Sequence, residues 1–188
     1  FKSQLSRWLE YGTIEQDTSH VCPYIGNEYL SNSVLASINS VVETMDRKKC
    51  IMGVFDEFCM GMYNAAIPDE LLFEMSVYKE RLSQSALFAE MQTVTETEAC
   101  EVFNWIKGRG FNFHFGSDSD TELTESQVLE QCKMYIAACR IGECFGCDAI
   151  GIQYQQGLKD VCSASDLVEG MLNSSDRPPV KNAEGKII

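Results

Sequence analysis

Short apolar runs alternate along this chain with longer segments of helical periodicity, and this alternation limits the possible folds most strongly. Residues 28–46 carry apolar side chains at spacings of three and four, which predicts an amphipathic helix, and the apolar run at 50–55 predicts a buried strand. A second such pair is a helix at 124–145 followed by a strand at 148–154. Strands separated by helices need crossover connections, so we expect an α/β fold with three αβα layers and a mainly parallel, Rossmann-like sheet.

The remaining elements are predicted from caps, turn residues and alternation. Thr95 and Thr124 have the side chains and spacing expected of helix N-caps. Aromatic and polar residues alternate at 111–115, which is typical of a strand. Beyond these we expect a short helix after Pro68, a strand at 77–82, and helices at 2–11, 83–91, 95–108 and 163–172.

The chain is expected to contain one complete α/β domain and parts of its neighbours. We predict that residues 1–27 are an interdomain connection, that 28–180 form the α/β domain, and that 181–188 begin a following region. The sequence starts at Phe1 without an initiator Met and ends with apolar residues that resemble the start of another strand. We therefore expect both ends to have been cut from a longer protein.

Charge excludes several classes of partner. Lys and Arg number 15 against 28 Asp and Glu, which gives a net charge of −13. Nucleic acids and anionic membranes bind basic patches, so we expect neither as a partner. No uninterrupted apolar run approaches the length that a membrane-spanning helix needs.

The nine cysteines favour a reducing compartment. An odd number cannot all pair within one chain, and no signal-peptide pattern opens the sequence, so we predict a cytoplasmic protein with reduced thiols. The pair Cys144-x-x-Cys147 supplies two of the four ligands that a structural zinc site needs. Two further cysteines, Cys132 and Cys139, lie on the preceding predicted helix. Packing of small thiols is the alternative, and we favour it.

Other familiar chemistry is weakly indicated. His20 and His114 are the only histidines and are isolated, so a Ser-His-Asp or Cys-His catalytic set has little support. Glycine-rich phosphate loops are absent from the sequence. The acidic stretch at 118–125 lacks the spacing of a calcium loop, and we expect it to be a solvated loop and helix start.

Two polar loops are expected beyond the carboxyl ends of strands, where parallel sheets bind ligands. The first, residues 56–64, opens with the carboxylates Asp56 and Glu57, and Gly61 would permit close backbone approach or a positive φ. A helix cap with packed methionines is the alternative. Cys59 would be the nucleophile if the protein were a cysteine enzyme, although no histidine is near it in sequence.

The second loop, residues 155–162, follows Gln153 and contains Gln155 and Gln156. Amide side chains both donate and accept hydrogen bonds, which suits neutral polyhydroxyl ligands such as sugars. A solvated loop is the alternative.

These loops carry a resemblance to a known family. Residues 59–64, Cys-Met-Gly-Met-Tyr-Asn, with Ile-Pro-Asp at 67–69, and the segment 145–157, Phe-Gly-Cys-Asp-Ala-Ile-Gly-Ile-Gln-Tyr-Gln-Gln-Gly, resemble L-fucose isomerase and its relatives. The segment 167–179 continues the likeness. By order of elements the likeness covers about residues 33–180, with its identities concentrated in these three stretches.

The resemblance implies a metal-dependent aldose–ketose isomerase. In that family a divalent metal, usually Mn²⁺, binds two sugar oxygens while carboxylates move a proton through an enediol. Such a metal lowers the pKa of the sugar hydroxyl and stabilises the enediolate charge. This chain resembles the middle domain, and the resemblance implies that the metal ligands belong to a later part of the protein. We therefore expect Mn²⁺ in the full-length protein, and no metal ligand or cofactor in this segment.

The resemblance also assigns substrate-facing residues. Met60 matches a methionine in the turn after the strand, and Gln155 matches a glutamine after a strand that ends in an aromatic residue. Gln156, Asp56 and Glu57 would make further contacts, although the family is neutral and glycine-rich where this chain is acidic, which leaves the sugar open. Family active sites lie between subunits, which implies a homo-oligomer. The alternative function is a non-catalytic carbohydrate-binding or sensing module of the same fold.

Overall fold

The computed structural model describes residues 2–13, 17, 19–22, 26, 29–57, 62, 66–153 and 157–188. The chain forms two compact units, Phe1–Val42 and Glu43–Ile188. Helix α1 (Lys2–Tyr11), in the first unit, agrees with the prediction and has no buried residue. Helix α2 (Asn32–Lys48) crosses the division between the units and also has no buried residue. The predicted domain boundaries at residues 27 and 180 stay predictions.

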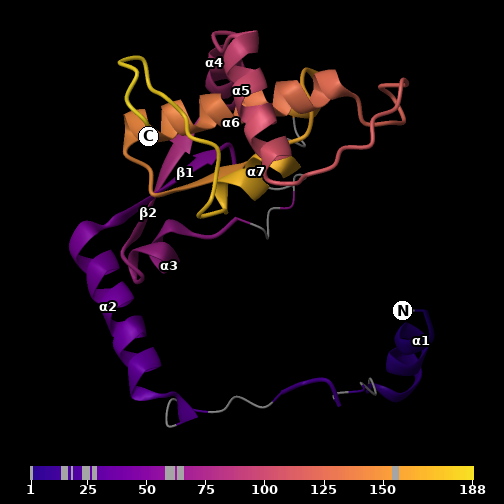
Figure 1. Ribbon diagram of the computed structural model, residues 1–188. Helices are drawn as coiled ribbons and strands as arrows, with labels where there is room; N and C mark the ends of the chain where they lie inside the picture. The colour runs from indigo at the N-terminus through magenta and orange to yellow at the C-terminus, as the bar shows by residue number, and fades with distance from the viewer. Residues whose placement is uncertain are drawn as a thin grey trace. The chain divides into compact units, whose positions relative to one another are not determined.

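The second unit contains a parallel sheet of three strands, as the alternating pattern predicts. The strands are β1 (Cys50–Phe55), β2 (Val77–Leu82) and β3 (Ala149–Ile152), and their order in the sheet is β2-β1-β3 (Figure 1). Strand β3 is shorter than the predicted strand at 148–154. It starts at Ala149 and ends at Ile152.

The strand register directs one face of the sheet into the core. Phe55 of β1 lies beside Leu82 of β2 and Ile152 of β3, and all three side chains are buried. Laterally paired residues of a sheet point to the same face, so this row marks the face that the large helix layer covers.

Helices cover both faces of the sheet and complete the three αβα layers. Helix α3 (Asp69–Phe73) packs against β2 on one side, and on the other side α6 (Glu125–Phe145) packs against its neighbouring helices (Figure 1). Residues 134–139 of α6 are all buried, as expected of a helix enclosed by others. Among the described residues, no helix is long and apolar enough to cross a membrane. The neighbours of α6 are α4 (Gln84–Met91), α5 (Glu96–Gly108) and α7 (Asp166–Leu172).

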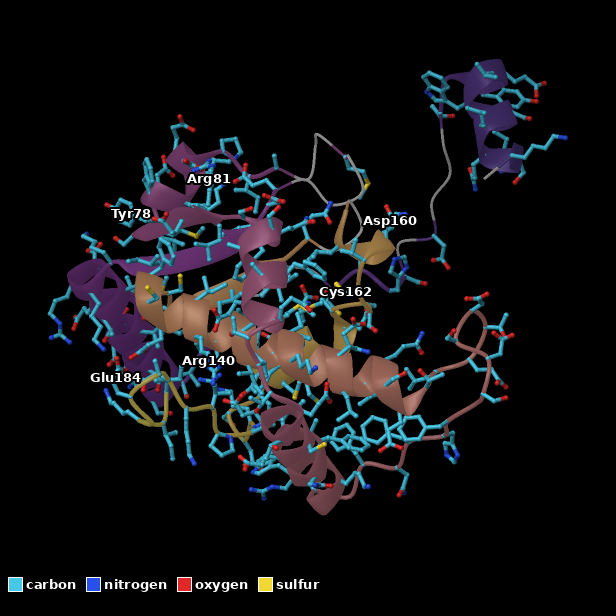
Figure 2. The ribbon with its side chains drawn as sticks, turned by 90° about the horizontal axis from the view of Figure 1, so that it is seen from above. Tyr78, Arg81, Arg140, Asp160, Cys162 and Glu184 are labelled. Atoms are coloured by element: carbon cyan, nitrogen blue, oxygen red, sulfur yellow. The ribbon has the colours of Figure 1, made fainter. Side chains whose placement is uncertain are left out.

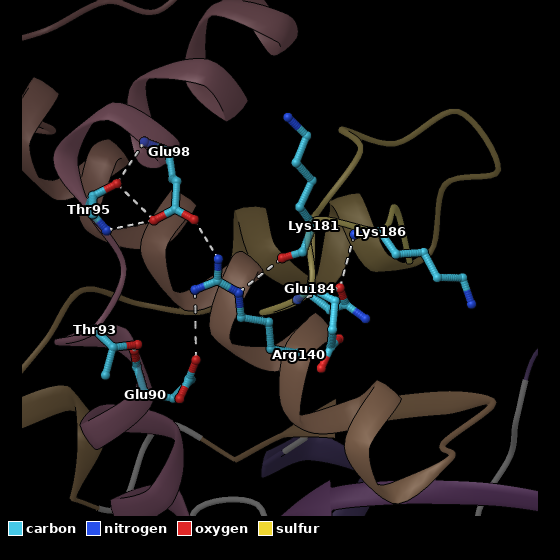
Figure 3. A network of polar contacts seen from close by, with 9 residues as sticks. Glu90, Thr93, Thr95, Glu98, Arg140, Lys181, Glu184 and Lys186 are labelled. Atoms are coloured by element: carbon cyan, nitrogen blue, oxygen red, sulfur yellow. Dashed lines mark hydrogen bonds and ion pairs between the residues drawn. The ribbon is translucent and has the colours of Figure 1, made fainter.

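Both predicted N-caps form, and one of them also takes part in an ion-pair network. The Thr95 hydroxyl accepts from the Glu98 amide, and the Glu98 carboxylate accepts from the Thr95 amide, which makes a capping box. Thr124 makes the same arrangement at the start of α6. Arg140 of α6 then contacts the Glu98 carboxylate and lies 3.8 Å from the Glu90 carboxylate of α4 (Figure 3). These contacts join α4, α5 and α6.

The strand predicted at residues 111–115 is wrong. The segment belongs to no strand of the described sheet. Its aromatic side chains pack instead on α5, where the Phe113 and Phe103 ring centroids are 5.4 Å apart. The alternation of aromatic and polar residues therefore reflects one face packed on a helix rather than a place in the sheet.

Gly53 should be the least replaceable glycine of the sheet. A Cβ at Gly53 would lie 2.7 Å from Cys147 Sγ and 3.0 Å from Leu82 Cδ1, so Gly53→Ala should lower the free energy of unfolding by about 1–3 kcal/mol. Gly151→Ala on β3 is the matched control, because a Cβ there meets no atom within 4 Å. Urea unfolding of both variants measures the difference, and equal stability of the two would contradict the packing described.

Candidate functional site at the carboxyl edge of the sheet

The two predicted loops begin side by side at the carboxyl edge. The Gln153 amide donates to the Phe55 carbonyl at 3.1 Å, which continues the ladder between β1 and β3 past its last pair. On the other side of β1, the Asp56 amide donates to the Leu82 carbonyl at 3.0 Å. The chain leaves β1 toward β2, whereas β3 lies on the opposite side of β1. This reversal is the place where open α/β sheets bind ligands.

Asp56 makes the turn that ends β1. Its φ is 60°, in the left-handed region where aspartate is tolerated better than most residues. The residue is exposed, so its carboxylate faces solvent at the sheet edge. Glu57 is partly buried, and its carboxylate contacts the Lys79 side chain.

Glu57 is held by a buried lysine. The Lys79 side chain is 6% exposed, and its Nζ lies 2.5 Å from Glu57 Oε1 and 3.1 Å from Asp69 Oδ1. Burial by itself would lower the pKa of the Lys79 ammonium, but the contacts with Glu57 and Asp69 outweigh burial and raise this pKa above its usual value. Lys79 also donates to the Ile67 carbonyl at 2.8 Å. A single side chain therefore binds both sides of the loop between residues 57 and 67.

Arg81 completes a charge cluster, which we define as Glu57, Asp69, Lys79 and Arg81. Its Nη2 donates to both Asp69 carboxylate oxygens, at 2.9 and 3.0 Å, and hydrogen bonds from Arg81 and Lys79 lower the pKa of Asp69. Lys79 and Arg81 are two residues apart on β2, so their side chains share the face opposite Leu82. Figure 2 shows Arg81 on the side of the sheet away from α6.

The charge cluster does not suit a divalent metal. Its two carboxylates are already paired with two cations, and a metal ion would be repelled by the ammonium and the guanidinium. Across the described residues, no group of three or more His, Cys, Asp or Glu side chains is placed to hold a metal ion.

Gln84 holds the second loop in the way that Lys79 holds the first. It is the first residue of α4 and is only 7% exposed. Its Nε2 donates to the Gln153 carbonyl, and its Oε1 accepts from the Leu158 amide at 3.3 Å. Gln84 thus binds both sides of the loop between residues 153 and 158, as Lys79 does for the first loop.

The structure describes only part of the predicted site. Asp56 and Glu57 lie at the carboxyl edge as expected, whereas Met60, Gln155, Gln156 and the alternative nucleophile Cys59 lie outside the described residues. Sequence reasoning missed the residues that hold the loops. One sequence feature could have pointed to them. Lys79 and Arg81 are two residues apart in the strand predicted at 77–82, so both lie on one face of it, and charged side chains on a covered face need oppositely charged partners. The missed residues are Asp69, Lys79, Arg81 and Gln84.

The cysteines fit the packing interpretation. Cys132 and Cys139 are buried in α6, and burial raises the pKa of the Cys132 thiol to about 12. Cys147 is partly buried, and burial raises the pKa of its thiol as well, while Cys144 is exposed. Thiols whose pKa is raised stay protonated near neutral pH and are poor nucleophiles.

The acidic loop uses its carboxylates internally. The Glu122 carboxylate accepts hydrogen bonds from the amides of Ser117 and Asp118, and these bonds lower its pKa. Asp118 accepts from the Asp120 amide and the Thr121 hydroxyl. The loop is therefore built by its own acidic groups, in keeping with the predicted solvated loop. His20 and His114 are both exposed.

Comparison with known proteins found no matching family model, no matching curated protein and no matching solved structure.

Lys79→Met should destabilise the protein, because it leaves Glu57 and Asp69 side by side with only the half-exposed Arg81 as a shared cation. Both carboxylates keep some solvent contact, so we expect a loss of about 1–3 kcal/mol in the free energy of unfolding rather than the full cost of an unpaired buried charge. Arg81→Met is the matched control and should cost less, since the Arg81 side chain is 53% exposed. Denaturant unfolding ranks the two variants, and the reverse order would show that Lys79 is not the main support.

Proposed function

We propose that this chain is the middle α/β domain of a metal-dependent aldose–ketose sugar isomerase related to L-fucose isomerase, and that it supplies substrate-facing residues. The observation that carries the proposal is the adjacency of the two loops that bear the resemblance. They begin on either side of one hydrogen bond, from the Gln153 amide to the Phe55 carbonyl. A ligand at this edge would be within reach of both loops.

Each loop has a separate role in the proposal. Gln155 and Gln156 hydrogen-bond sugar hydroxyls, since an amide can serve a hydroxyl as donor and as acceptor. Met60 shapes the wall of the pocket. Asp56 adds a polar contact from its exposed position at the end of β1. Glu57 acts indirectly, because Lys79 and Arg81 engage its carboxylate.

Lys79 and Gln84 are positioning residues in this proposal. Each is nearly buried and bonds to residues on both sides of one loop, so each limits where the loop can lie. Substrate-binding groups on a loop need such support, because small displacements weaken well-aligned hydrogen bonds.

Mn²⁺ would be held by the remaining domains of the same protein, because the charge cluster does not suit a metal. The other proposed partners are a sugar or sugar-like molecule and further copies of the chain in a homo-oligomer. A cytoplasmic location belongs to the same proposal and is supported by the free thiols of the described cysteines.

A non-catalytic carbohydrate-binding module is the second candidate. It would use the same edge of the sheet, where Asp56 is exposed beside the Gln153–Phe55 hydrogen bond, and it would need no metal ligand from another domain. Such a module would keep the same loops and bind the same class of ligand.

Gln155→Ala tests the substrate contact in the complete protein. Loss of a hydrogen bond that holds the sugar should lower kcat/KM about tenfold, through a higher KM or a lower kcat. Gln92→Ala is the matched control, since Gln92 is exposed at the end of α4, away from the sheet edge, and should leave the kinetics unchanged. Unchanged kinetics for Gln155→Ala would remove this residue from the site.

The same preparation separates the two functions. Interconversion of an aldose and its ketose in the presence of Mn²⁺ supports the isomerase. Saturable sugar binding in calorimetry with no turnover, lost in Gln155→Ala, would instead support the binding module.

Titration of the 188-residue chain with Mn²⁺ tests where the metal ligands lie. We expect no saturable heat of binding, because the carboxylates of the charge cluster are already paired. A control titration of the Lys79→Met, Arg81→Met double variant shows whether freeing Glu57 and Asp69 creates a site. Tight binding by the unaltered chain would contradict the placement of the ligands in other domains.

A further inference from the structure

Residues 111–115 form an extended segment with an aromatic face. The rings of Phe113 and Phe115 are nearly parallel, with centroids 5.6 Å apart and an interplanar angle of 5°. The centroids of Phe111 and Phe113 are 6.5 Å apart, and these rings are also stacked. Side chains two residues apart share a face only when the backbone is extended, so the chain has a strand-like course here without a sheet.

The aromatic face is only partly covered. Its inner side packs on Phe103 of α5, at 5.4 Å from Phe113 and 6.3 Å from Phe115. Phe111 nevertheless remains 58% exposed and Phe115 40% exposed. Three neighbouring aromatic rings therefore leave a continuous apolar strip at the surface.

The backbone of this segment is unpaired. The Gly110 amide bonds to Lys107 before the segment, and the Gly116 amide bonds to Leu123 after it. Between these two bonds, no backbone amide or carbonyl of 111–115 has a hydrogen-bond partner in the part of the chain that the structure describes. An exposed, extended and unpaired backbone is a template for the addition of another strand.

The segment is complementary to itself in antiparallel orientation. Its sequence, Phe-Asn-Phe-His-Phe, is nearly symmetric about Phe113. When two copies pair about that residue, Phe111 of each lies opposite Phe115 of the other, and Asn112 lies opposite His114. Cross-strand aromatic pairs are among the contacts that stabilise antiparallel strands most.

The flanking charges favour the same orientation. The basic residues Lys107 and Arg109 precede the segment, and the acidic loop at 117–122 follows it. Antiparallel pairing brings the basic flank of each copy toward the acidic flank of the other, whereas parallel pairing would bring like charges together. For chains that each carry a net charge of −13, this local complementarity matters for association.

We propose that residues 111–115 pair with the same residues of a second copy of this chain, as an antiparallel two-stranded ribbon on a two-fold axis. Such a contact is isologous, because the same surface serves both copies. It buries the aromatic strip and satisfies the free backbone groups together. The proposal does not depend on the sugar isomerase and adds a defined surface to the expected homo-oligomer.

Sedimentation over a range of protein concentrations tests the contact. Phe111→Lys replaces an exposed ring of the strip by a charge and should raise the dissociation constant of the dimer at least about tenfold. Phe145→Lys is the matched control, because Phe145 is 49% exposed but lies at the end of α6, outside the segment. A monomer at all concentrations, or equal effects of the two variants, overturns the proposal.

Charge reversal tests the orientation. Lys107→Glu and Asp120→Arg should each weaken the dimer, and the double variant should recover most of the affinity, because opposite charges again face each other. The Asp120 side chain is suited to this exchange, since only the Asp120 backbone amide takes part in the hydrogen bonds described for the loop. Additive weakening in the double variant would contradict antiparallel pairing.

Hydrogen exchange tests the strand pairing itself. The amides of 111–115 should become protected as the protein concentration rises through the dissociation constant, while the amides of 117–122 should not change. A dimer without protection of 111–115 overturns the proposal even if Phe111→Lys weakens it.

Discussion

The candidate site depends on two nearly buried side chains that each bind both sides of one loop. Lys79 of β2 contacts Glu57 and the Ile67 carbonyl, and Gln84 of α4 bonds to Gln153 and Leu158. Lys79 lies within β2, and Gln84 lies two residues after the end of that strand. A buried donor or acceptor destabilises the protein when it has no partner. The residues that flank each loop are therefore held by the interior of the protein, where they can pair with Lys79 or Gln84.

That arrangement in turn requires the register of the parallel sheet. Phe55, Leu82 and Ile152 lie in one row, and their burial against the helix layer sets the level at which all three strands end. A shift of one residue would turn these side chains to the opposite face and would also separate the two loops. The hydrophobic core and the polar edge are therefore consequences of the same pairing.

The place of Asp56 and Glu57 at the end of a strand could be predicted from the sequence, but the side chains that hold the ends of the two loops could not. The apolar run at 50–55 and the acidic pair after it predict a strand end with Asp56 and Glu57 in a loop, as found. Lys79 and Glu57 are 22 residues apart, and Gln84 and Gln153 are 69 apart. No local pattern marks such pairs, because their contacts exist only after the strands have assembled.

The sequence by itself determined the local elements, since periodicity and capping act within a few residues. Thr95 and Thr124 begin their helices as predicted, because each cap is satisfied by the amide three residues later. Tertiary structure alone decided which extended segments joined the sheet. Residues 111–115 have the alternation of a strand, yet their rings pack on Phe103 and their backbone stays outside the sheet. Alternation specifies which side chains share a face, whereas pairing depends on which sheet edge lies within reach.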